Sequence, residues 1–472
     1  MENGTSRRWW ALALIATAQF MVIMDTSIIG VALPRMQADL GFSQENLSWV
    51  FNAYVIAFGG LLLLGGRLSD LLGAKRVFAA GWVVLLVGSV VAGAAGQVWV
   101  ELTGRAVQGV GAALIAPSAL TLLMMLFGGT PKDLTKALAL YGAAAPAGGT
   151  AGVFLGGVLT EYVSWPWVFY INIPIALIVL AATPALMPGG AGQRGSTDLL
   201  GAVTVTAGLA AAVFAIVRAP EAGWGSTSTV VGLLVALVLL SAFLVTQARR
   251  RNPLVRLGIF RTPNLGAANI AQLLLGAAWI PMWFFLNLYL QQVLGLGAFA
   301  SGSALLPMTT VIMLIMIVIA PRLMARFGAK AMVVSGLVVL ALGLGWLSLV
   351  RPTGSFLADV LPASLVTAAG MALAFIPSLG TAISSARPEE GGLASGIVNT
   401  SYQVGSALGL AAMTALASSL GANQVGDTDL LTDGLSAAFV GAAGIALVGA
   451  LIAAATLRGQ RATQPEPATT AA

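Results

Sequence analysis

The sequence predicts an all-α protein that crosses a lipid bilayer many times, and three observations support this class. The chain has 472 residues, of which 58% are hydrophobic and only 8% are charged, whereas soluble domains carry about 25% charged residues. The apolar residues gather into runs of roughly 20, which is the length that a helix needs to cross the hydrocarbon core. These runs are too long for the strands of a membrane barrel, and helices satisfy their backbone groups internally.

The apolar runs predict fourteen membrane spans, most of them separated by short polar loops. Their expected bounds are 9–33, 48–66, 77–97, 101–126, 137–159, 165–187, 199–217, 229–248, 265–288, 301–320, 331–350, 357–380, 394–418 and 436–457.

The basic residues predict the orientation of these spans. The net charge of +6 could indicate nucleic-acid binding in a soluble protein, but here the Arg and Lys side chains fall in short loops between apolar runs. If both termini are cytoplasmic, only Arg35, Arg218 and Arg351 lie in outer segments. Cytoplasmic loops of membrane proteins are enriched in Lys and Arg. We therefore expect a bacterial cytoplasmic membrane protein with both ends inside and no nucleic-acid partner.

An internal repeat predicts how the spans are grouped. Segments 66–75 and 321–330 share Arg, Leu, Gly, Ala and Lys in the same register. If they are equivalent, each half has six helices, and two further helices lie between the halves. Duplicated helical halves are typical of secondary transporters. The expected domains are 1–187 (first bundle), 188–264 (two inserted helices and a basic loop), 265–457 (second bundle) and 458–472 (disordered tail).

Composition and motifs argue against an enzyme. The chain has neither Cys nor His, so it lacks thiolate ligands and the commonest general base and metal ligand. It has no phosphate-binding Gly-x-x-x-x-Gly-Lys-Ser/Thr loop and no paired carboxylates within a span. We expect no catalytic residue, metal or cofactor. A membrane sensor or scaffold is disfavoured too, because the sequence has no soluble signalling domain.

One carboxylate stands inside the first span. Asp25 precedes the helix exit Ala32-Leu33-Pro34, about 12 Å from the outer end at the rise of an α-helix. An ionised carboxylate inside the membrane is costly and usually has a function, and desolvation favours proton binding. A helix-end residue paired only for packing is the alternative.

One basic residue stands well inside a span. Arg105 lies roughly 8 Å below the outer end of its helix, at a depth similar to that of Asp25. Because charges within a membrane usually pair, we expect these two side chains to be close or to share a polar network. Glu101 competes for Arg105, since residues four apart share a helix face, and it is expected nearer the surface.

Four segments, 25–34, 66–76, 102–113 and 148–157, resemble signatures of the major facilitator superfamily and of its fourteen-helix drug:proton antiporter branch. The resemblance implies a major facilitator fold and assigns proton coupling to Asp25 and Arg105. It makes the second segment a conformational latch, whereas a tight turn with topology-setting charges is the simpler interpretation. The latch residues that match are Gly66, Asp70, Gly73, Lys75 and Arg76.

The fourth segment resembles the fifth-helix antiporter signature. Its matching residues are Gly148, Gly152, Gly156 and Gly157, whereas Val153 stands where the family has Pro. Helix packing is the alternative role of these glycines, because small residues allow close approach of membrane helices.

Polar residues of the second half predict a large, weakly polar cavity. Each of them is alternatively a packing or interface residue. The candidates are Asn269, Gln272, Trp283, Asn287, Asn399 and Gln403.

Together these features predict proton-coupled efflux of hydrophobic or amphipathic compounds, such as drugs, antibiotics or dyes, by alternating access. The partners would be a small amphipathic organic substrate, protons and the bilayer, with the chain functional as a monomer. A transporter of one specific metabolite, exporter or importer, is the alternative.

Overall fold

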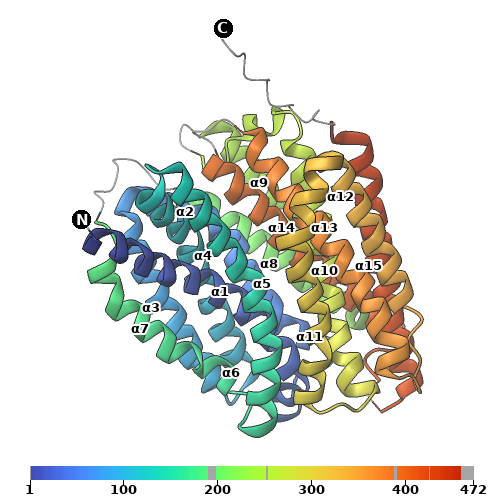
Figure 1. The fold of residues 1–472 in the computed structure, drawn as a ribbon. Coiled ribbons are helices and arrows are strands. Elements are labelled where there is room, and N and C mark those ends of the chain that lie inside the picture. Colours follow the sequence, from blue (N-terminus) through green and yellow to red (C-terminus); the bar gives the residue numbers. More distant parts are fainter. Residues whose placement is uncertain (1, 190–197, 251–252, 387–390, 425, 459–472) are drawn as a thin grey trace.

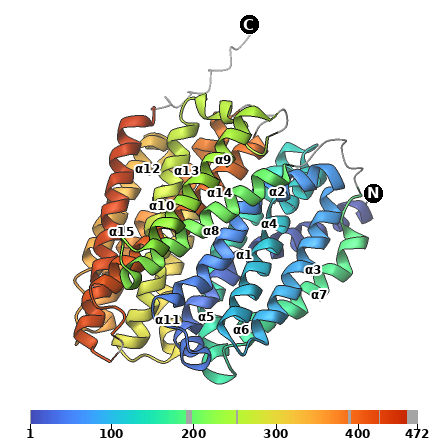
Figure 2. The same ribbon diagram turned by 180° about the vertical axis from the view of Figure 1, so that it is seen from behind.

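The computed structural model describes residues 2–189, 198–250, 253–386, 391–424 and 426–458. Within these ranges the regular structure is helical, and two bundles stand side by side (Figures 1 and 2). The first bundle consists of α1 (Glu2–Leu40), α2 (Trp49–Leu72), α3 (Ala74–Gly93), α4 (Val98–Phe127), α5 (Pro131–Tyr162), α6 (Trp167–Tyr170) and α7 (Asn172–Leu186). The second consists of α10 (Leu265–Leu288), α11 (Ala298–Leu314), α12 (Ala320–Leu347), α13 (Leu361–Ser385), α14 (Gly391–Ser419) and α15 (Thr428–Thr456).

The expected all-α polytopic class is confirmed, but the count of fourteen spans is not. Twelve helical segments among the described residues are long and apolar enough to cross a membrane. One of them, Ala298–Leu347, has 50 residues and contains Gly328 in a non-helical conformation. The thirteenth expected span corresponds to α14, which is not one of the twelve because polar residues at 399–403 interrupt its apolar sequence. The expected disordered tail lies outside the described residues, apart from Arg458.

The two bundles repeat the same helix pairings. In the first, α1 packs on α5 and α3 packs on α4, and in the second α10 packs on α14 and α12 packs on α13. Gly73 and Gly328 hold equivalent places in the repeated segments, and both have a positive φ, of 89° and 79°. Side chains with a Cβ rarely adopt this backbone conformation, which explains why both segments carry Gly there. The exact domain boundaries stay a prediction.

The inserted helices α8 (Leu199–Ala222) and α9 (Thr227–Arg249) lie at the junction of the bundles. Here α8 packs on α9 and also on α2 and α14, so it contacts both halves. The buried Asp198 carboxylate holds the pair together: it caps α8 at the Gly201 amide (2.9 Å), accepts from Gln247 (2.6 Å) and pairs with Arg250 (2.8 Å). Helix α9 leaves many apolar side chains exposed, as expected for a helix that faces lipid.

Glycines of α5 allow α1 to approach closely. A Cβ at Gly152 would lie 2.8 Å from Ser27 Cβ and 2.9 Å from the Met24 carbonyl oxygen, and one at Gly156 would lie 2.8 Å from the Ile28 carbonyl oxygen. These contacts are with backbone or Cβ atoms, which cannot move aside without moving α1. The spacing of α1 and α5 therefore depends on the small size of these residues.

At the end of the bundles opposite the termini, polar side chains join the two halves. Gln37, Gln44 and Gln292 form a closed ring of hydrogen bonds of 2.7, 3.0 and 2.8 Å. Nearby, Gln291 donates to the Val31 carbonyl oxygen (2.9 Å), and the Glu161 carboxylate accepts from the Ala298 amide at the start of α11 (2.8 Å). The polar contacts at this end stand beside a hydrophobic core that both halves share, because buried Val31 of α1 and Phe284 of α10 belong to one apolar cluster.

Two neighbouring carboxyl groups, those of Glu45 and Glu221, lie at the same end of the bundles, opposite the termini. Glu45, in the loop between α1 and α2, is only 4% exposed and accepts from Asn423 of the α14–α15 loop (3.3 Å). Burial raises the pKa of Glu45 to about 7, helped by a hydrogen bond with Glu221 of α8 and by the charge of that carboxylate, and opposed by the Asn423 donor. This contact therefore links the first half, an inserted helix and the second half in a pH-sensitive way.

We predict that Gly152→Ala destabilises the protein by about 1–3 kcal/mol, the usual cost of overpacking, because the new methyl group pushes α1 from α5. Thermal unfolding of the purified protein in detergent measures this change. The matched control is Gly142→Ala on the same helix, where a Cβ meets nothing within 4 Å; it should be neutral or stabilise by up to ~1 kcal/mol. An equal loss in both variants would contradict the packing argument.

We predict that Glu45 makes thermal stability fall between about pH 5 and pH 8. Its folded pKa is raised, so its contribution is complete below the unfolded value of 4.5 and is lost as pH rises through about 7. In Glu45→Gln this component of the pH dependence should vanish, whereas it should persist in Asp433→Asn, a change of an exposed carboxylate on α15. A pH dependence unchanged by Glu45→Gln would show that another group is responsible.

Candidate functional site

The centre of the first bundle contains a buried ion pair. The Asp25 side chain of α1 and the Arg105 side chain of α4 are 1% and 0% exposed, and Arg105 Nη1 lies 2.6 Å from Asp25 Oδ2. The expected proximity of these residues is therefore observed. It arises because α1 and α4 run in opposite directions, so that the two side chains reach the same level from opposite ends.

Amide groups complete the surroundings of the Asp25 carboxylate. Its Oδ1 atom accepts from Asn172 Nδ2 of α7 (2.9 Å) and Gln108 Nε2 of α4 (3.1 Å). Both amides also donate to Ser89 Oγ of α3, at 3.1 and 2.9 Å, and this hydroxyl donates to the Leu85 carbonyl oxygen (2.8 Å). The side chains that contact the Asp25 carboxylate all act as hydrogen-bond donors to it. Ser89 orients the two amides among them. The arrangement fits an ionised carboxylate, which can only accept.

The guanidinium group of Arg105 is held on several sides. Its Nε donates to the Val50 carbonyl oxygen of α2 (3.0 Å), and Nη1 also donates to Gln108 Oε1 (2.8 Å). The group lies over the Tyr54 ring, 4.6 Å from its centroid. The remaining nitrogen, Nη2, is buried and has no hydrogen-bond partner within the described ranges. One donor of this cation is thus unused in this conformation.

The structure corrects the expectation for Glu101. This residue lies in the first turn of α4, nearer the helix end than Arg105 as expected, but its side chain is 0% exposed there. It forms no ion pair with Arg105, which is bound to Asp25 instead. Among the described residues neither carboxyl oxygen of Glu101 has a hydrogen-bond partner.

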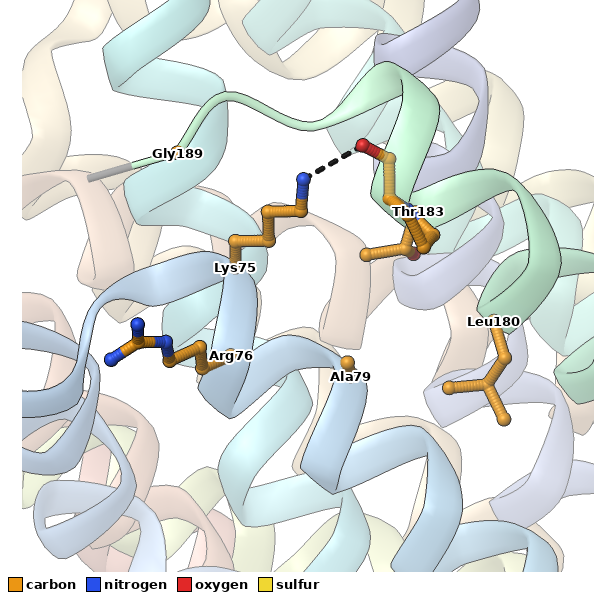
Figure 3. A pocket seen from close by; sticks show the side chains of 7 residues that line it. Lys75, Arg76, Ala79, Leu180, Thr183 and Gly189 are labelled. Carbon is orange, nitrogen blue, oxygen red and sulfur yellow. Dashed lines mark hydrogen bonds between the residues drawn. The ribbon is translucent and has the colours of Figure 1, made fainter.

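The predicted latch segment forms the turn between α2 and α3. Figure 3 shows Lys75 reaching across a hollow of about 360 Å³ toward the end of α7. There its Nζ donates to the carbonyl oxygens of Pro184 (2.8 Å) and Met187 (3.2 Å), a favourable place for a cation because helix C-termini carry negative charge. Lys75 therefore ties the start of α3 to the end of α7 within the first bundle.

The other latch residues have separate surroundings. Asp70 and Arg76 are exposed, and Arg67 is a charged neighbour of Asp70 on the same helix. Gly73 supplies the positive φ of the turn, whereas a Cβ at Gly66 would meet Pro117 at an ordinary 3.7 Å. The geometry explains Gly73 and Lys75 as parts of the turn, and a latch role for Asp70 stays a prediction.

The glycines of the predicted antiporter helix lie against two different helices. Gly148, Gly152 and Gly156 face α1, whereas Gly157 faces α11, where a Cβ would lie 2.9 Å from the Ala298 carbonyl oxygen. Helix α5 therefore contacts the helix that carries Asp25 and also the second half. Val153, in place of the family's Pro, is fully buried, and α5 is helical from Pro131 to Tyr162.

The six expected cavity residues are dispersed in this conformation. Asn269 and Gln272 are buried within the second bundle, where they bond Ser401 (2.9 Å) and Ser378 (2.9 Å). Two others, Trp283 and Asn287, are buried where α10 meets Gly30 of α1. Asn399 and Gln403 of α14 are partly exposed, and Gln403 packs against Gly59 of α2. A substrate-binding role for this set stays a prediction.

Sequence reasoning did not assign the amide and hydroxyl partners of Asp25. Gln108 could have been found, since it lies three residues after Arg105 on the same helix face. Ser89 and Asn172 are single polar residues at apolar helices, and nothing in their own segments shows that they meet the same carboxylate.

Comparisons with known proteins agree with this architecture. The sequence profile of the Major Facilitator Superfamily matches residues 15–410 and 313–472. The chain is 39% identical over 448 residues to the cephamycin export protein CmcT of Amycolatopsis lactamdurans, covering 93% of this chain and 91% of that protein. It is 35% identical to the puromycin resistance protein pur8 of Streptomyces alboniger (96% and 92% covered) and 30% identical to the lincomycin resistance protein of Streptomyces lincolnensis (98% and 94%).

Solved structures share the fold at low identity. The transporter PepTSo of the POT family superimposes with a TM-score of 0.68 at 17% identity, covering 94% of this chain and 97% of that chain. The nucleoside transporter NupG gives a TM-score of 0.67 at 15% identity, covering 95% and 99%. With a profile that matches most of the sequence and relatives that match nearly all of it, this multi-pass membrane protein belongs to the major facilitator superfamily.

Proposed function

We propose that this chain exports antibiotics or related amphipathic organic compounds across the bacterial cytoplasmic membrane in exchange for protons, as a monomer with both termini inside. The direction and the substrate class are supported by relatives named for cephamycin export, puromycin resistance and lincomycin resistance. The single observation that carries the proton coupling is the buried Asp25–Arg105 pair.

The coupling follows from the charge of Asp25. In this conformation its carboxylate is paired with Arg105 and accepts from two amides. A proton bound to Asp25 removes its negative charge, so the ion pair is lost and one oxygen becomes a donor with no acceptor facing it. The network must then rearrange, because leaving a buried charge without its partner is strongly unfavourable. Proton binding at Asp25 thereby favours a different arrangement of α1, α4 and α7.

The contacts between the halves would distinguish the two access states, in which the protein is open at one end of the bundles or at the other. The glutamine ring and the Glu161–Ala298 contact hold the bundles together at the end opposite the termini. Opening that end breaks these polar contacts, and the turn containing Asp70 and Lys75 lies at the other end of the first bundle. The Gly152 and Gly156 contacts leave little freedom between α1 and α5, so a shift of α1 would carry α5 with it. Because Gly157 of α5 faces α11, such a shift would connect the state of Asp25 to the contact between the halves.

A narrow substrate range is the alternative to multidrug efflux. The three relatives above are each named for one antibiotic or antibiotic class, which favours a transporter of a specific compound. The weakly polar surroundings of α10 and α14, with no acidic residue deep in either helix, favour amphipathic molecules of either kind.

We predict that Asp25→Asn abolishes energy-driven efflux of preloaded ethidium or puromycin from cells, to the level of cells that lack the transporter. In the wild type a protonophore should have the same effect. The matched control is Asp39→Asn, an exposed carboxylate on the same helix that binds Trp165, which should export normally. If Asp25→Asn exports as well as the wild type, proton coupling lies elsewhere. If only one of the two compounds leaves wild-type cells, the narrow-range alternative is favoured.

A further inference from the structure

A second buried carboxyl group lies one helical turn from the ion pair. Glu101 is four residues before Arg105 on α4, and their Cα atoms are about 6 Å apart along the axis. Its side chain is 0% exposed, and neither oxygen has a hydrogen-bond partner in the part of the chain that the structure describes. The proposed mechanism above makes no use of this group.

The charges around Glu101 do not balance if all three groups are ionised. Arg105 and Asp25 are the charged groups that act on it, and Glu101 forms no ion pair with a cation within the described ranges. Two carboxylates facing one guanidinium would leave a net negative charge among buried side chains. An ionised carboxylate with no hydrogen bond is among the most costly groups to bury. One bound proton restores neutrality, and the geometry shows which carboxyl carries it: Asp25 is surrounded by donors, whereas Glu101 is not.

We propose that Glu101 is a second proton-binding site, and that Arg105 exchanges between Asp25 and Glu101 as one proton passes between the two carboxyl groups. This inference rests on the proposed proton coupling and adds a residue to it. The unused Nη2 atom of Arg105 is the donor available for Glu101, and a spacing of four residues places both side chains on one face of α4.

The exchange balances in atoms and charge. In the observed state Glu101 is the neutral acid, and Asp25 is the carboxylate bound to Arg105. The O–H bond of Glu101 breaks, and a new O–H bond forms on Asp25. Glu101 then carries the negative charge, and Arg105 turns from Asp25 to Glu101. The two carboxyl groups are not hydrogen-bonded to each other in the described structure, because neither Glu101 oxygen has a partner there. The transfer therefore requires side-chain movement, which connects it to the conformational change.

The position of Glu101 gives the transfer a direction. Glu101 lies in the first turn of α4, nearer than Arg105 to the end that is opposite the termini. If the termini are cytoplasmic, a proton that arrives from outside meets Glu101 before Asp25. Glu101 would then load the proton and Asp25 would couple it to transport.

The first test is infrared spectroscopy of the purified protein, which detects the carbonyl stretch of a protonated carboxylic acid without requiring transport. The wild type at neutral pH should show this band from a buried acid. The test is made in a Glu45→Gln background, because Glu45, with its pKa raised to about 7, would otherwise give a second band of this kind. In that background the band should be lost in Glu101→Gln and retained in Glu161→Gln, a change of a carboxylate that is already bonded to a backbone amide. It should also be lost in Asp25→Asn, because Glu101 is then the remaining counter-charge for Arg105 and should ionise. A band that is unchanged in Glu101→Gln would overturn the proposal.

The second test separates a proton role from a structural one. Because Gln resembles the neutral acid, Glu101→Gln should keep exchange of ethidium or puromycin at equal concentrations on both sides of proteoliposomes, but should lose uphill transport driven by a pH gradient. Glu101→Asp should restore part of the uphill transport. Loss of exchange together with uphill transport would indicate a structural residue. If Asp25→Asn loses uphill transport but Glu101→Gln keeps it, the proposed function stands and this inference fails. If the wild type shows no proton-driven transport, the proposed function fails and the infrared band alone decides whether Glu101 holds a proton.

Discussion

The structure of the first bundle depends on how it compensates two opposite charges buried in an apolar environment. Removing an ion pair from water costs several kcal/mol per ion, and the mutual attraction repays this cost only when further hydrogen bonds satisfy the remaining donors and acceptors. Here the compensation requires α1, α2, α3, α4 and α7 at once, through Asp25, the Val50 carbonyl, Ser89, Gln108 and Asn172. A small rotation of any of these helices changes the polar network. The charge of Asp25 therefore affects the positions of most helices in the bundle.

The two halves share helix pairings but not chemistry. The second bundle pairs its helices as the first does, yet its interior polar groups are amides and hydroxyls, such as Gln272 and Ser378, that bond one another. Neutral groups of this kind hold helices together without a charge to titrate. The duplicated architecture therefore places a buried ion pair in the first half and neutral polar groups in the second. In the proposed mechanism the first half would respond to protons and the second would supply the neutral surface that moves relative to it.

The sequence was sufficient for features that depend on one segment or on helix geometry. The apolar runs gave the polytopic all-α class, and the depth of Asp25 and Arg105 predicted that they meet. The register of the two repeated segments placed Gly73 and Gly328 at equivalent positions, where the backbone requires glycine. Features that depend on how each helix is rotated about its axis relative to its neighbours could not be predicted from the sequence. Glu101 lies close to a helix end as expected, but its complete burial could not be predicted from α4 alone. The meeting of Ser89 with Asn172, and the ring of Gln37, Gln44 and Gln292, require partners from segments that are distant in the sequence.

The inserted helices make the two seams between the bundles unequal. One seam, between α2 and α14, is covered by α8, which packs on both, and α9 adds a further layer toward the lipid (Figure 2). The other seam, between α5 and α11, has no such covering helix among the described residues (Figure 1). A hydrophobic molecule dissolved in the bilayer is thus blocked on one side of the protein and meets the bare contact of α5 with α11 on the other. In the proposed exporter, the insertion would leave a single lateral side at which molecules could be captured from the membrane.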